Sequence, residues 1–157
     1  MNANSRYLSF TLGKEQYAIP LLTVREVIGV PEITPVPFTP NYFLGIMNLR
    51  GQVISVVDLR LKMNMGAGKN TSETAIIICD LGVTSLGVVV DSINAVIAPQ
   101  ENEISPKPDI QSSKSTDYIT GVFQRDKQLI LLIDMVGILS PQDRQAMVNA
   151  TGTRSAA

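Results

Sequence analysis

The stretch Asn48-Leu-Arg-Gly-Gln-Val-Ile-Ser-Val-Val-Asp-Leu-Arg60 decides the fold, because a related stretch recurs later in the chain. It begins with a polar turn, continues as an apolar, β-branched run and ends on charged side chains, a pattern typical of a hairpin entering a sheet. A shift of 76 positions places the segment 45–58 on the segment 121–134. The matching pairs are Gly45/Gly121, Gln52/Gln128, Ile54/Ile130 and Asp58/Asp134, with Tyr42 on Tyr118 upstream. Glycine, glutamine and aspartate have no hydrophobic bias, so the match indicates an internal duplication.

The elements upstream of this stretch recur in the same order. Alternating residues predict a strand over 7–12, which a turn over 13–16 joins to a strand over 17–19. The segment 74–90 repeats this order of strand, turn and strand. At a shift of 69, Leu12-Gly13 falls on Leu81-Gly82 and Val27-Ile28 falls on Val96-Ile97. The larger shift later in the chain places about seven extra residues within 99–117, which we interpret as an enlarged surface loop.

The segments between these strands predict short helices and extended loops. Pro20 suits the first turn of a helix whose apolar face would consist of Leu21, Val24, Val27 and Ile28. Thr39-Pro40 predicts a further single helical turn, which Gly45 would end. Four prolines within 30–40 exclude the middle of a sheet, because proline cannot donate to the hydrogen-bond ladder.

The two copies are expected to form one folding unit. A unit of about 60 to 70 residues buries only ~60% of its unfolded surface and is marginal alone. Short strands with Gly- and Pro-rich turns favour two small antiparallel barrels, and the seam between them would be a natural groove. We also expect a surface connection over 62–73, a short helix over 140–150 and a disordered tail over 151–157.

The residue types that are absent restrict the chemistry. The chain contains no His and no Trp, and its single Cys, Cys79, cannot form an internal disulfide or a CxxC motif. This excludes His-dependent nucleophiles and His-ligated zinc, and we expect no metal and no cofactor. Thirteen basic and 14 acidic residues give a net charge of −1, which does not favour a nucleic-acid partner. No apolar run approaches the ~20 residues of a membrane span, so we expect a cytoplasmic protein without direct membrane insertion.

Several polar and apolar residues have two interpretations at this point. Arg50 lies in a turn, where it is either a solvated side chain or a contact at a protein interface. Asp58, Asp91 and Asp134 follow apolar strands, where aspartate commonly accepts backbone N–H bonds. A small hydrolase that uses these aspartates as acid and base is the alternative. Leu21 and Ile110 either pack on their own barrel or contact a partner.

Five segments together resemble the CheW-like chemotaxis coupling proteins. They are Val24-Arg-Glu-Val27, Gly45-Ile-Met-Asn-Leu-Arg-Gly51, Val57-Asp-Leu-Arg60, Leu86-Gly-Val-Val-Val-Asp91 and Asp117-Tyr-Ile-Thr-Gly121. The resemblance spans about residues 6–140. It implies a mainly β fold of two intertwined SH3-like five-stranded barrels, related by the internal duplication and accompanied by short helices. We place the first barrel at about 13–75 and the second at about 76–140, with the N-terminal strand as a candidate for sharing between them; 141–157 would be the C-terminal helix and tail.

The same resemblance implies a non-enzymatic adaptor. Such proteins link methyl-accepting chemotaxis receptors to the CheA histidine kinase, with a receptor helix in the groove between the barrels and the kinase's regulatory domain on the barrel faces. The positions that match receptor- or kinase-binding surfaces of the family are Val24, Glu26, Gly45, Asn48, Arg50 and Val96. Leu21 and Ile110 are the candidates for contacts with the kinase. A side chain at Gly45 would obstruct close approach of a helix.

The resemblance also sets expectations for assembly and location. The isolated chain is expected to be a monomer that is recruited to receptor arrays at the inner face of the membrane. The chain contains neither kinase nor receiver sequence, so it resembles a stand-alone coupler. The alternative is a coupling scaffold in another receptor–kinase array that does not control motility.

Overall fold

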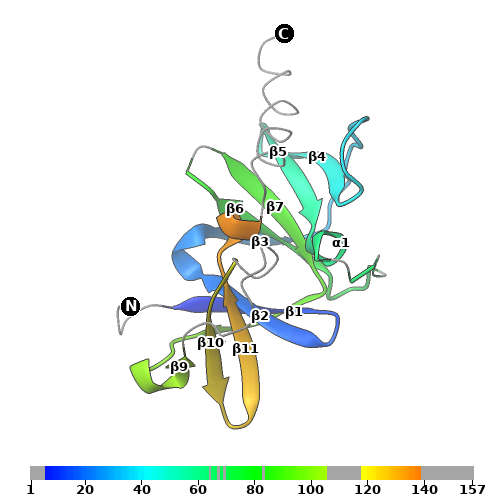
Figure 1. Cartoon of the computed structure of the whole chain (residues 1–157). Helices are drawn as coiled ribbons and strands as arrows, with labels where there is room; N and C mark the ends of the chain where they lie inside the picture. Colours follow the sequence, from blue (N-terminus) through cyan, green and yellow to red (C-terminus); the bar gives the residue numbers. More distant parts are fainter. Residues whose placement is uncertain are drawn as a thin grey trace.

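Segments in which apolar and polar residues alternate form strands in this chain, and so do continuous apolar segments. These strands form two sheets (Figure 1). The structure is a computed structural model, and it describes residues 6–63, 65–66, 68, 70–82, 84–105 and 118–138. Sheet A has the order β8-β1-β2-β11-β10-β9 and sheet B the order β3-β6-β7-β5-β4. The strands of sheet A are β1 (Tyr7–Leu12), β2 (Glu15–Pro20), β8 (Ser92–Ile97), β9 (Ile104–Ser105), β10 (Ile119–Arg125) and β11 (Gln128–Ile133). Those of sheet B are β3 (Val24–Gly29), β4 (Phe43–Leu49), β5 (Gln52–Asp58), β6 (Ala75–Asp80) and β7 (Ser85–Val90).

Helical segments within the described part of the chain are single turns that end or join strands. Two of them, α1 (Leu59–Lys62) and α2 (Met135–Ile138), directly follow β5 and β11. The 3-10 turns η1 (Leu21–Thr23) and η2 (Glu101–Glu103) precede β3 and β9. The helix predicted over 140–150 and the tail lie outside the described residues.

The two copies of the duplication match in local detail. The backbone N–H of Asp58 donates to Tyr42 O and that of Asp134 to Tyr118 O, each at 2.8 Å. Each aspartate then accepts the N–H of the residue two positions on, at the start of α1 or α2. The strand register shifts beside Gly45 and beside Gly121. These equivalent contacts confirm the repeat that was read from the sequence.

The sheets exchange hairpins between the two copies. Sheet A combines β1 and β2 of the first copy with β8 to β11 of the second, and sheet B combines β6 and β7 with β3 to β5. In each sheet the exchanged hairpin pairs in parallel with the last strand of the other copy, as β2 with β11 and β7 with β5. The fold is therefore intertwined, and five strands of six or seven residues form the body of each sheet.

The barrel boundary placed between residues 75 and 76 is therefore wrong. It assigns β6 and β7 to the second barrel, whereas both belong to sheet B with β3, β4 and β5. It also separates β2 from β11, with which it pairs in sheet A, whereas β1, the candidate for sharing between the barrels, does pair with β8 of the second copy. The two copies in the sequence do not correspond to the two barrels in space. The first hairpin of each copy pairs with the strands of the other copy and not with those of its own.

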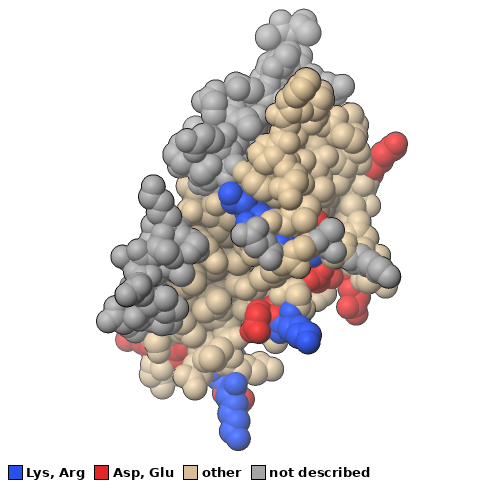
Figure 2. Space-filling view, turned by 45° about the vertical axis from the view of Figure 1, so that its right-hand side comes forward, with Lys and Arg blue, Asp and Glu red and all other residues tan. Residues whose placement is uncertain are grey.

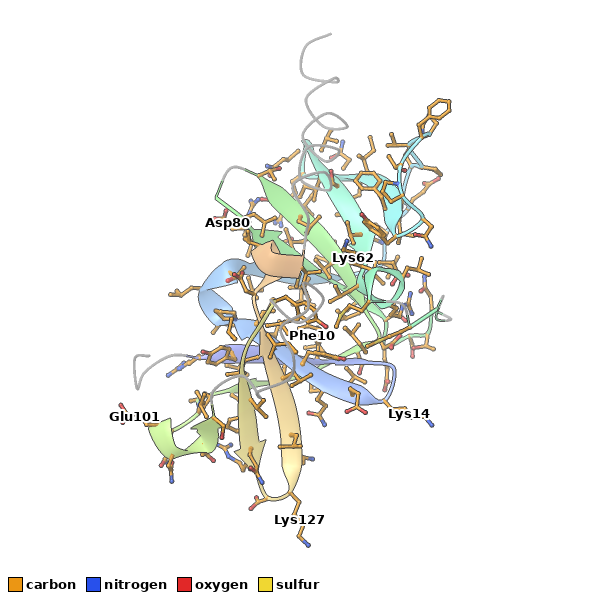
Figure 3. All side chains as sticks on the ribbon, in the orientation of Figure 1. Phe10, Lys14, Lys62, Asp80, Glu101 and Lys127 are labelled. Carbon is orange, nitrogen blue, oxygen red and sulfur yellow. The ribbon has the colours of Figure 1, made fainter. Side chains whose placement is uncertain are left out.

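One large core joins the two sheets, and each sheet has a smaller core of its own. The shared core includes Phe10 of β1, Val57 of β5 and Val88 of β7, all at most 2% exposed. Figure 3 shows Phe10 near the centre of the molecule, between the two sheets. Strand β6 buries both faces, since Ile77 packs in the shared core and Ile76 in the core of sheet B. A strand buried on both faces requires the continuous apolar run that the sequence has there.

The helix predicted from Pro20 is wrong beyond its first turn. Leu21–Thr23 forms a 3-10 turn, after which Val24–Gly29 continues as β3 and pairs with β6. β-branched residues fit a pleated edge, and pairing with the open side of β6 outweighs the helical spacing of the apolar residues. The helical turn predicted at Thr39-Pro40 is wrong as well, because the Phe43 N–H donates to Pro40 O in a β-turn that leads directly into β4.

Candidate inter-barrel groove

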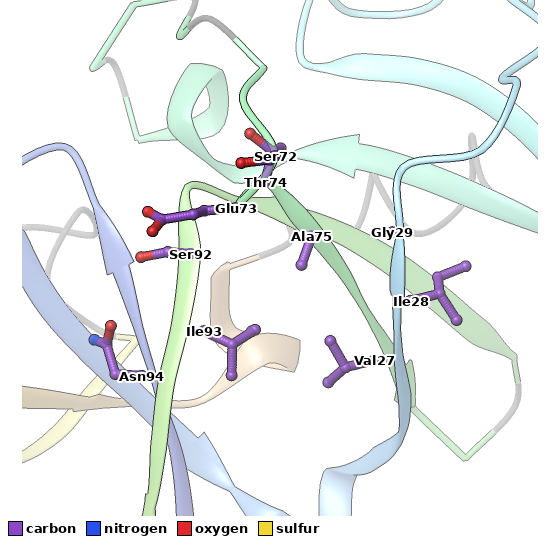
Figure 4. Close-up of a pocket in the computed structure, with 10 residues that line it drawn as sticks. All are labelled: Val27, Ile28, Gly29, Ser72, Glu73, Thr74, Ala75, Ser92, Ile93 and Asn94. Atoms are coloured by element: carbon purple, nitrogen blue, oxygen red, sulfur yellow. The ribbon is translucent and has the colours of Figure 1, made fainter.

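A groove of about 540 Å³ lies between the edge strands of the two sheets (Figure 4). Strand β3 is the edge of sheet B and β8 is the edge of sheet A, and the two strands are equivalent in the duplication. They run in opposite directions along the groove, so the start of β8 faces the end of β3. The lining residues are Val27 to Gly29 from β3, Ser72 to Ala75 before and in β6, and Ser92 to Asn94 from β8.

Each of these edge strands exposes one valine to solvent. Val27 of β3 is 41% exposed and Val96 of β8 is 52% exposed. They occupy the same position in the two copies, because the shift of 69 places one on the other. Val24, at the start of β3, is partly buried and packs against the shared core. Exposed apolar side chains on two unpaired edges are typical of a protein-binding surface.

The structure brings Glu26, Asn48 and Arg50 together at one end of sheet B. Arg50 Nη2 donates to Glu26 Oε2, and this pair joins β3 to the turn between β4 and β5. The Arg50 side chain is 69% exposed. Asn48 Oδ1 accepts the Gly51 N–H at 2.8 Å, which fixes a turn in which Arg50 and Gly51 both have positive φ. The turn thus presents a guanidinium at the surface, beside the strand that forms one wall of the groove.

Gly45 is buried, and the chain itself explains why the position is glycine. A Cβ at residue 45 would lie 2.7 Å from the carbonyl carbon of Thr34 and 2.9 Å from Pro35 Cα, and φ is +143°. Only glycine adopts this φ readily. The close approach is therefore made by the chain's own Thr34-Pro35 backbone, which forms a bridge to Ile46.

The leucines of η1 divide into a packed one and an exposed one. Leu21 packs against the shared core, and its N–H donates to Arg6 O at 2.8 Å. Leu22 is 99% exposed. Leu22 is therefore the apolar side chain that η1 offers to a partner, and the sequence analysis did not single it out. Ile110 lies outside the described residues.

A buried ionic network lies beside the groove. Arg60 is 3% exposed, and its Nε and Nη2 donate to Asp58 Oδ1 and Oδ2 at 3.0 Å each. Its Nη1 donates to Asp91 Oδ1 at 2.9 Å and its Nη2 to Asn70 Oδ1 at 3.1 Å. The hydrogen bond to Asp58 is the main cause of a raised pKa at Arg60, and burial opposes it. The residue stays charged at every pH at which proteins fold.

The aspartates that the sequence offered as an acid–base pair have structural partners. Asp58 is buried and caps α1 while it binds Arg60. Asp134 accepts the Val136 N–H at 3.1 Å. Burial raises the pKa of the Cys79 thiol to about 12, so this thiol is not a nucleophile. Among the described residues, no group of three or more His, Cys, Asp or Glu side chains could hold a metal ion.

Charged side chains are scattered on the face shown in Figure 2. Lys and Arg alternate with Asp and Glu on a surface that is mostly uncharged. This distribution differs from the continuous basic stripe of a nucleic-acid interface. In the part of the chain that the structure describes, no helix is long and apolar enough to cross a membrane.

Fold and groove together describe a mainly β protein with two intertwined sheets and an open groove between two strand edges. A family model described as CheW-like domain matches residues 6–143. The chain belongs to this family, whose members are non-catalytic scaffolds of chemotaxis signalling. Family membership confirms the predicted fold class of two intertwined barrels and the prediction that the protein is not an enzyme.

Known relatives cover nearly the whole chain. Chemotaxis protein CheW of Klebsiella aerogenes is 31% identical over 143 residues, which cover 91% of this chain and 86% of that protein. Chemotaxis protein CheW of Helicobacter pylori is 31% identical over 134 residues, covering 85% and 81%. The crystal structure of the scaffolding protein TtCheW from Thermoanaerobacter tengcongensis superposes with a TM-score of 0.77 at 31% identity. That match covers 84% of this chain and 90% of TtCheW.

Sequence reasoning missed three features of the site. Val27 could have been found, because the duplication pairs it with Val96. Arg60 is part of one of the segments that resemble the family. Its burial, however, depends on Asn70 and Asp91, which lie 10 and 31 residues further along the chain. Leu22 differs from Leu21 only in the direction that the 3-10 turn gives it.

Proposed function

We propose that this protein couples methyl-accepting chemoreceptors to a CheA-type histidine kinase, with a receptor helix lying in the groove between β3 and β8. The observation that carries the proposal is the pair of exposed valines on two equivalent edge strands that flank one groove. An amphipathic helix binds by placing its apolar face in such a groove. The polar lining residues Ser72, Glu73 and Asn94 would meet the polar flanks of that helix.

The Glu26–Arg50 pair supplies the second part of the receptor surface. An exposed ion pair contributes only ~0–1 kcal/mol to stability, so either partner can turn to a receptor side chain at little cost. Arginine suits this role because its guanidinium makes forked contacts to carboxylates. Asn48 contributes by fixing the turn that carries Arg50.

The kinase contacts lie on the barrel faces, outside the groove. Leu22 in η1 and the loop that contains Ile110 are the proposed kinase-side contacts, and the packed Leu21 supports Leu22 from behind. Separate faces allow receptor and kinase to bind at the same time. The complex would then assemble in the cytoplasm, at the inner face of the membrane that holds the receptors.

Co-sedimentation with receptor-containing membranes tests the proposal. The protein should sediment with the membranes and should bring the kinase with it. Val27→Glu, which places a charge in the groove, should reduce receptor sedimentation about tenfold, an effect of ~1.4 kcal/mol. Leu129→Glu, which replaces an exposed apolar residue on β11 outside the groove, is the surface control. Failure of the unaltered protein to bind either partner would refute the coupling function.

A further inference from the structure

Arg60 hydrogen-bonds to Asp91 and Asn70, which lie next to two segments that line the groove. We propose that Arg60 is a positioning residue that fixes the width of the groove at the end where β7 passes into β8. The inference rests on the proposed function, since the groove that Arg60 shapes is the candidate receptor site.

The guanidinium of Arg60 is held rigidly on sheet B. Asp58 binds it through two parallel hydrogen bonds of 3.0 Å, and the same carboxylate caps α1 by accepting the Arg60 N–H at 3.0 Å. A forked Arg–carboxylate pair constrains direction as well as distance. The other N–H groups of the Arg60 guanidinium therefore have fixed directions.

Those donors reach the residues next to two of the three lining segments of the groove, the β8 segment and the segment that leads into β6. Nη1 donates to Asp91, which directly precedes Ser92, the first lining residue of the β8 wall. Nη2 donates to Asn70, which lies two residues before Ser72, the first lining residue of the segment that leads into β6. One side chain thus connects these two segments, and Figure 4 shows Glu73 and Ser92 near each other at one end of the groove.

Asp91 connects Arg60 to sheet A through hydrogen bonds. It is the single residue between β7 of sheet B and β8 of sheet A. Its Oδ2 accepts the Gly13 N–H of the β1–β2 turn at 2.6 Å, and its own N–H donates to Thr11 O at 3.0 Å. The path from Arg60 through Asp91 to Gly13 therefore connects the two sheets through side chains that are mostly buried.

The surrounding chain is shaped to fit Arg60. A Cβ at Gly68 would lie 2.9 Å from Arg60 Cδ and from Arg60 Cζ, so the backbone of residue 68 packs directly on this side chain. Residues 62–73 were expected to be a simple surface connection, but Gly68 and Asn70 are both in contact with Arg60. Gly68 and Asn70 lie against Arg60, and Arg60 is 3% exposed.

The second copy of the duplication lacks the arrangement. Val136 falls on Arg60 at the shift of 76, and Leu22 falls on Asp91 at the shift of 69. The fold itself therefore does not require the network, because the equivalent crossover from β2 to β3 forms without it. Buried ion pairs are also no better for stability than apolar residues of similar volume, so their value lies in the geometry that they impose. Here that geometry is the spacing of the groove walls.

Distance measurements between the walls test the inference. Nitroxide labels on Glu73→Cys and Asn94→Cys report the width of the groove in pulsed electron paramagnetic resonance, and the buried Cys79 stays unlabelled. Asp91→Asn keeps one oxygen that can accept from Arg60 but loses the oxygen that accepts the Gly13 N–H. Arg60→Lys loses the pair of parallel hydrogen bonds to Asp58. Asp80→Asn is the matched control, because Asp80 accepts the Gly82 N–H at 2.9 Å within a single turn of sheet B.

The expected result is a broader label distance distribution in Asp91→Asn and Arg60→Lys, with the control unchanged. Affinity for a helical-hairpin peptide from a chemoreceptor tip should fall about fivefold, while affinity for the kinase stays the same. An unchanged distribution, or a broadened one with unchanged receptor affinity, overturns the inference. If Arg60→Lys does not fold, Asp91→Asn decides. If the unaltered protein does not bind the peptide, the proposed function fails, and the distance distributions alone decide whether Arg60 sets the groove.

Discussion

At the scale of single residues, the structure separates side chains that maintain the fold from exposed side chains that are proposed to contact a partner. Gly45 belongs to the first group, because the Thr34-Pro35 backbone occupies the space of its Cβ. Arg50 and Leu22 belong to the second, because both are largely exposed and their removal leaves no buried group unpaired. The sequence motif that contains Gly45 and Arg50 is contiguous, yet its residues have different roles.

Gly45→Ala should destabilise the protein by about 2–3 kcal/mol, because the methyl group would collide with the Thr34-Pro35 backbone. Chemical denaturation measures this loss. Gly29→Ala is the matched control, since a Cβ at residue 29 meets nothing within 4 Å. Equal stability of the two variants would show that residue 45 is glycine for a reason outside the fold.

Arg50→His should weaken assembly with the receptor about tenfold, or ~1.4 kcal/mol, and change the free energy of unfolding by less than ~1 kcal/mol. Histidine tolerates the positive φ of residue 50, so the turn should persist. The assay is receptor binding beside thermal unfolding. Arg125→His, which breaks the exposed pair with Glu103 at the other barrel, is the control. A variant that unfolds would assign Arg50 to the fold instead of the interface.

At the scale of elements, the sequence predicted the strands better than it predicted their neighbours. The strands over 7–12 and 74–90 were found because alternation and continuous apolar runs are local signals. Strand β3 was mistaken for a helix because Val24, Val27 and Ile28 also fit helical spacing, and only the open edge of β6 decides between the two. Of the candidate positions named from the sequence, Glu26 and Arg50 form an ion pair, and Asn48 binds the turn that carries Arg50; their role in binding stays a prediction. The Arg60 network was not predicted, because only Asp58 is close in sequence, while Asn70 and Asp91 lie 10 and 31 residues further along the chain.

The β10–β11 hairpin gives a prediction with a definite pH window. Two hydrogen bonds from Arg125, and then the Gln100 N–H, lower the pKa of Glu103 from 4.5 to about 2. A lowered folded-state pKa adds stability that is complete above about 4.5 and disappears as the pH falls to about 2. Glu103→Gln should therefore melt slightly below the unaltered protein at pH 7 and at the same temperature near pH 2. A difference that persists at pH 2 would contradict the assignment.

At the scale of the whole molecule, the exchange of hairpins makes the two copies mutually dependent. Each sheet takes two strands from one copy and three or more from the other, and the shared core contains side chains from both sheets. The groove exists because this exchange leaves β3 and β8 as the outer edges of neighbouring sheets. Fold and binding surface therefore arise from the same topological feature.

Cutting the chain between the copies should abolish folding of either fragment alone. The fragments 1–68 and 69–157 contain β1 to β5 and β6 to β11, so neither holds a complete sheet. When mixed, they should assemble into the native structure. Amide dispersion in nuclear magnetic resonance spectra measures both results. A dispersed spectrum from one isolated fragment would show that a copy folds as an independent barrel.

The central claim is that the groove between β3 and β8 receives a receptor helix. The most direct test is a titration of the isotope-labelled protein with a helical-hairpin peptide from a chemoreceptor tip, followed by amide chemical shifts. The account predicts the largest changes at residues 24–29 and 92–97 and at the Arg50 turn, with little change at the β10–β11 hairpin tip near Lys127. Changes that concentrate at the hairpin tip or on η1, with β3 and β8 unaffected, would contradict it.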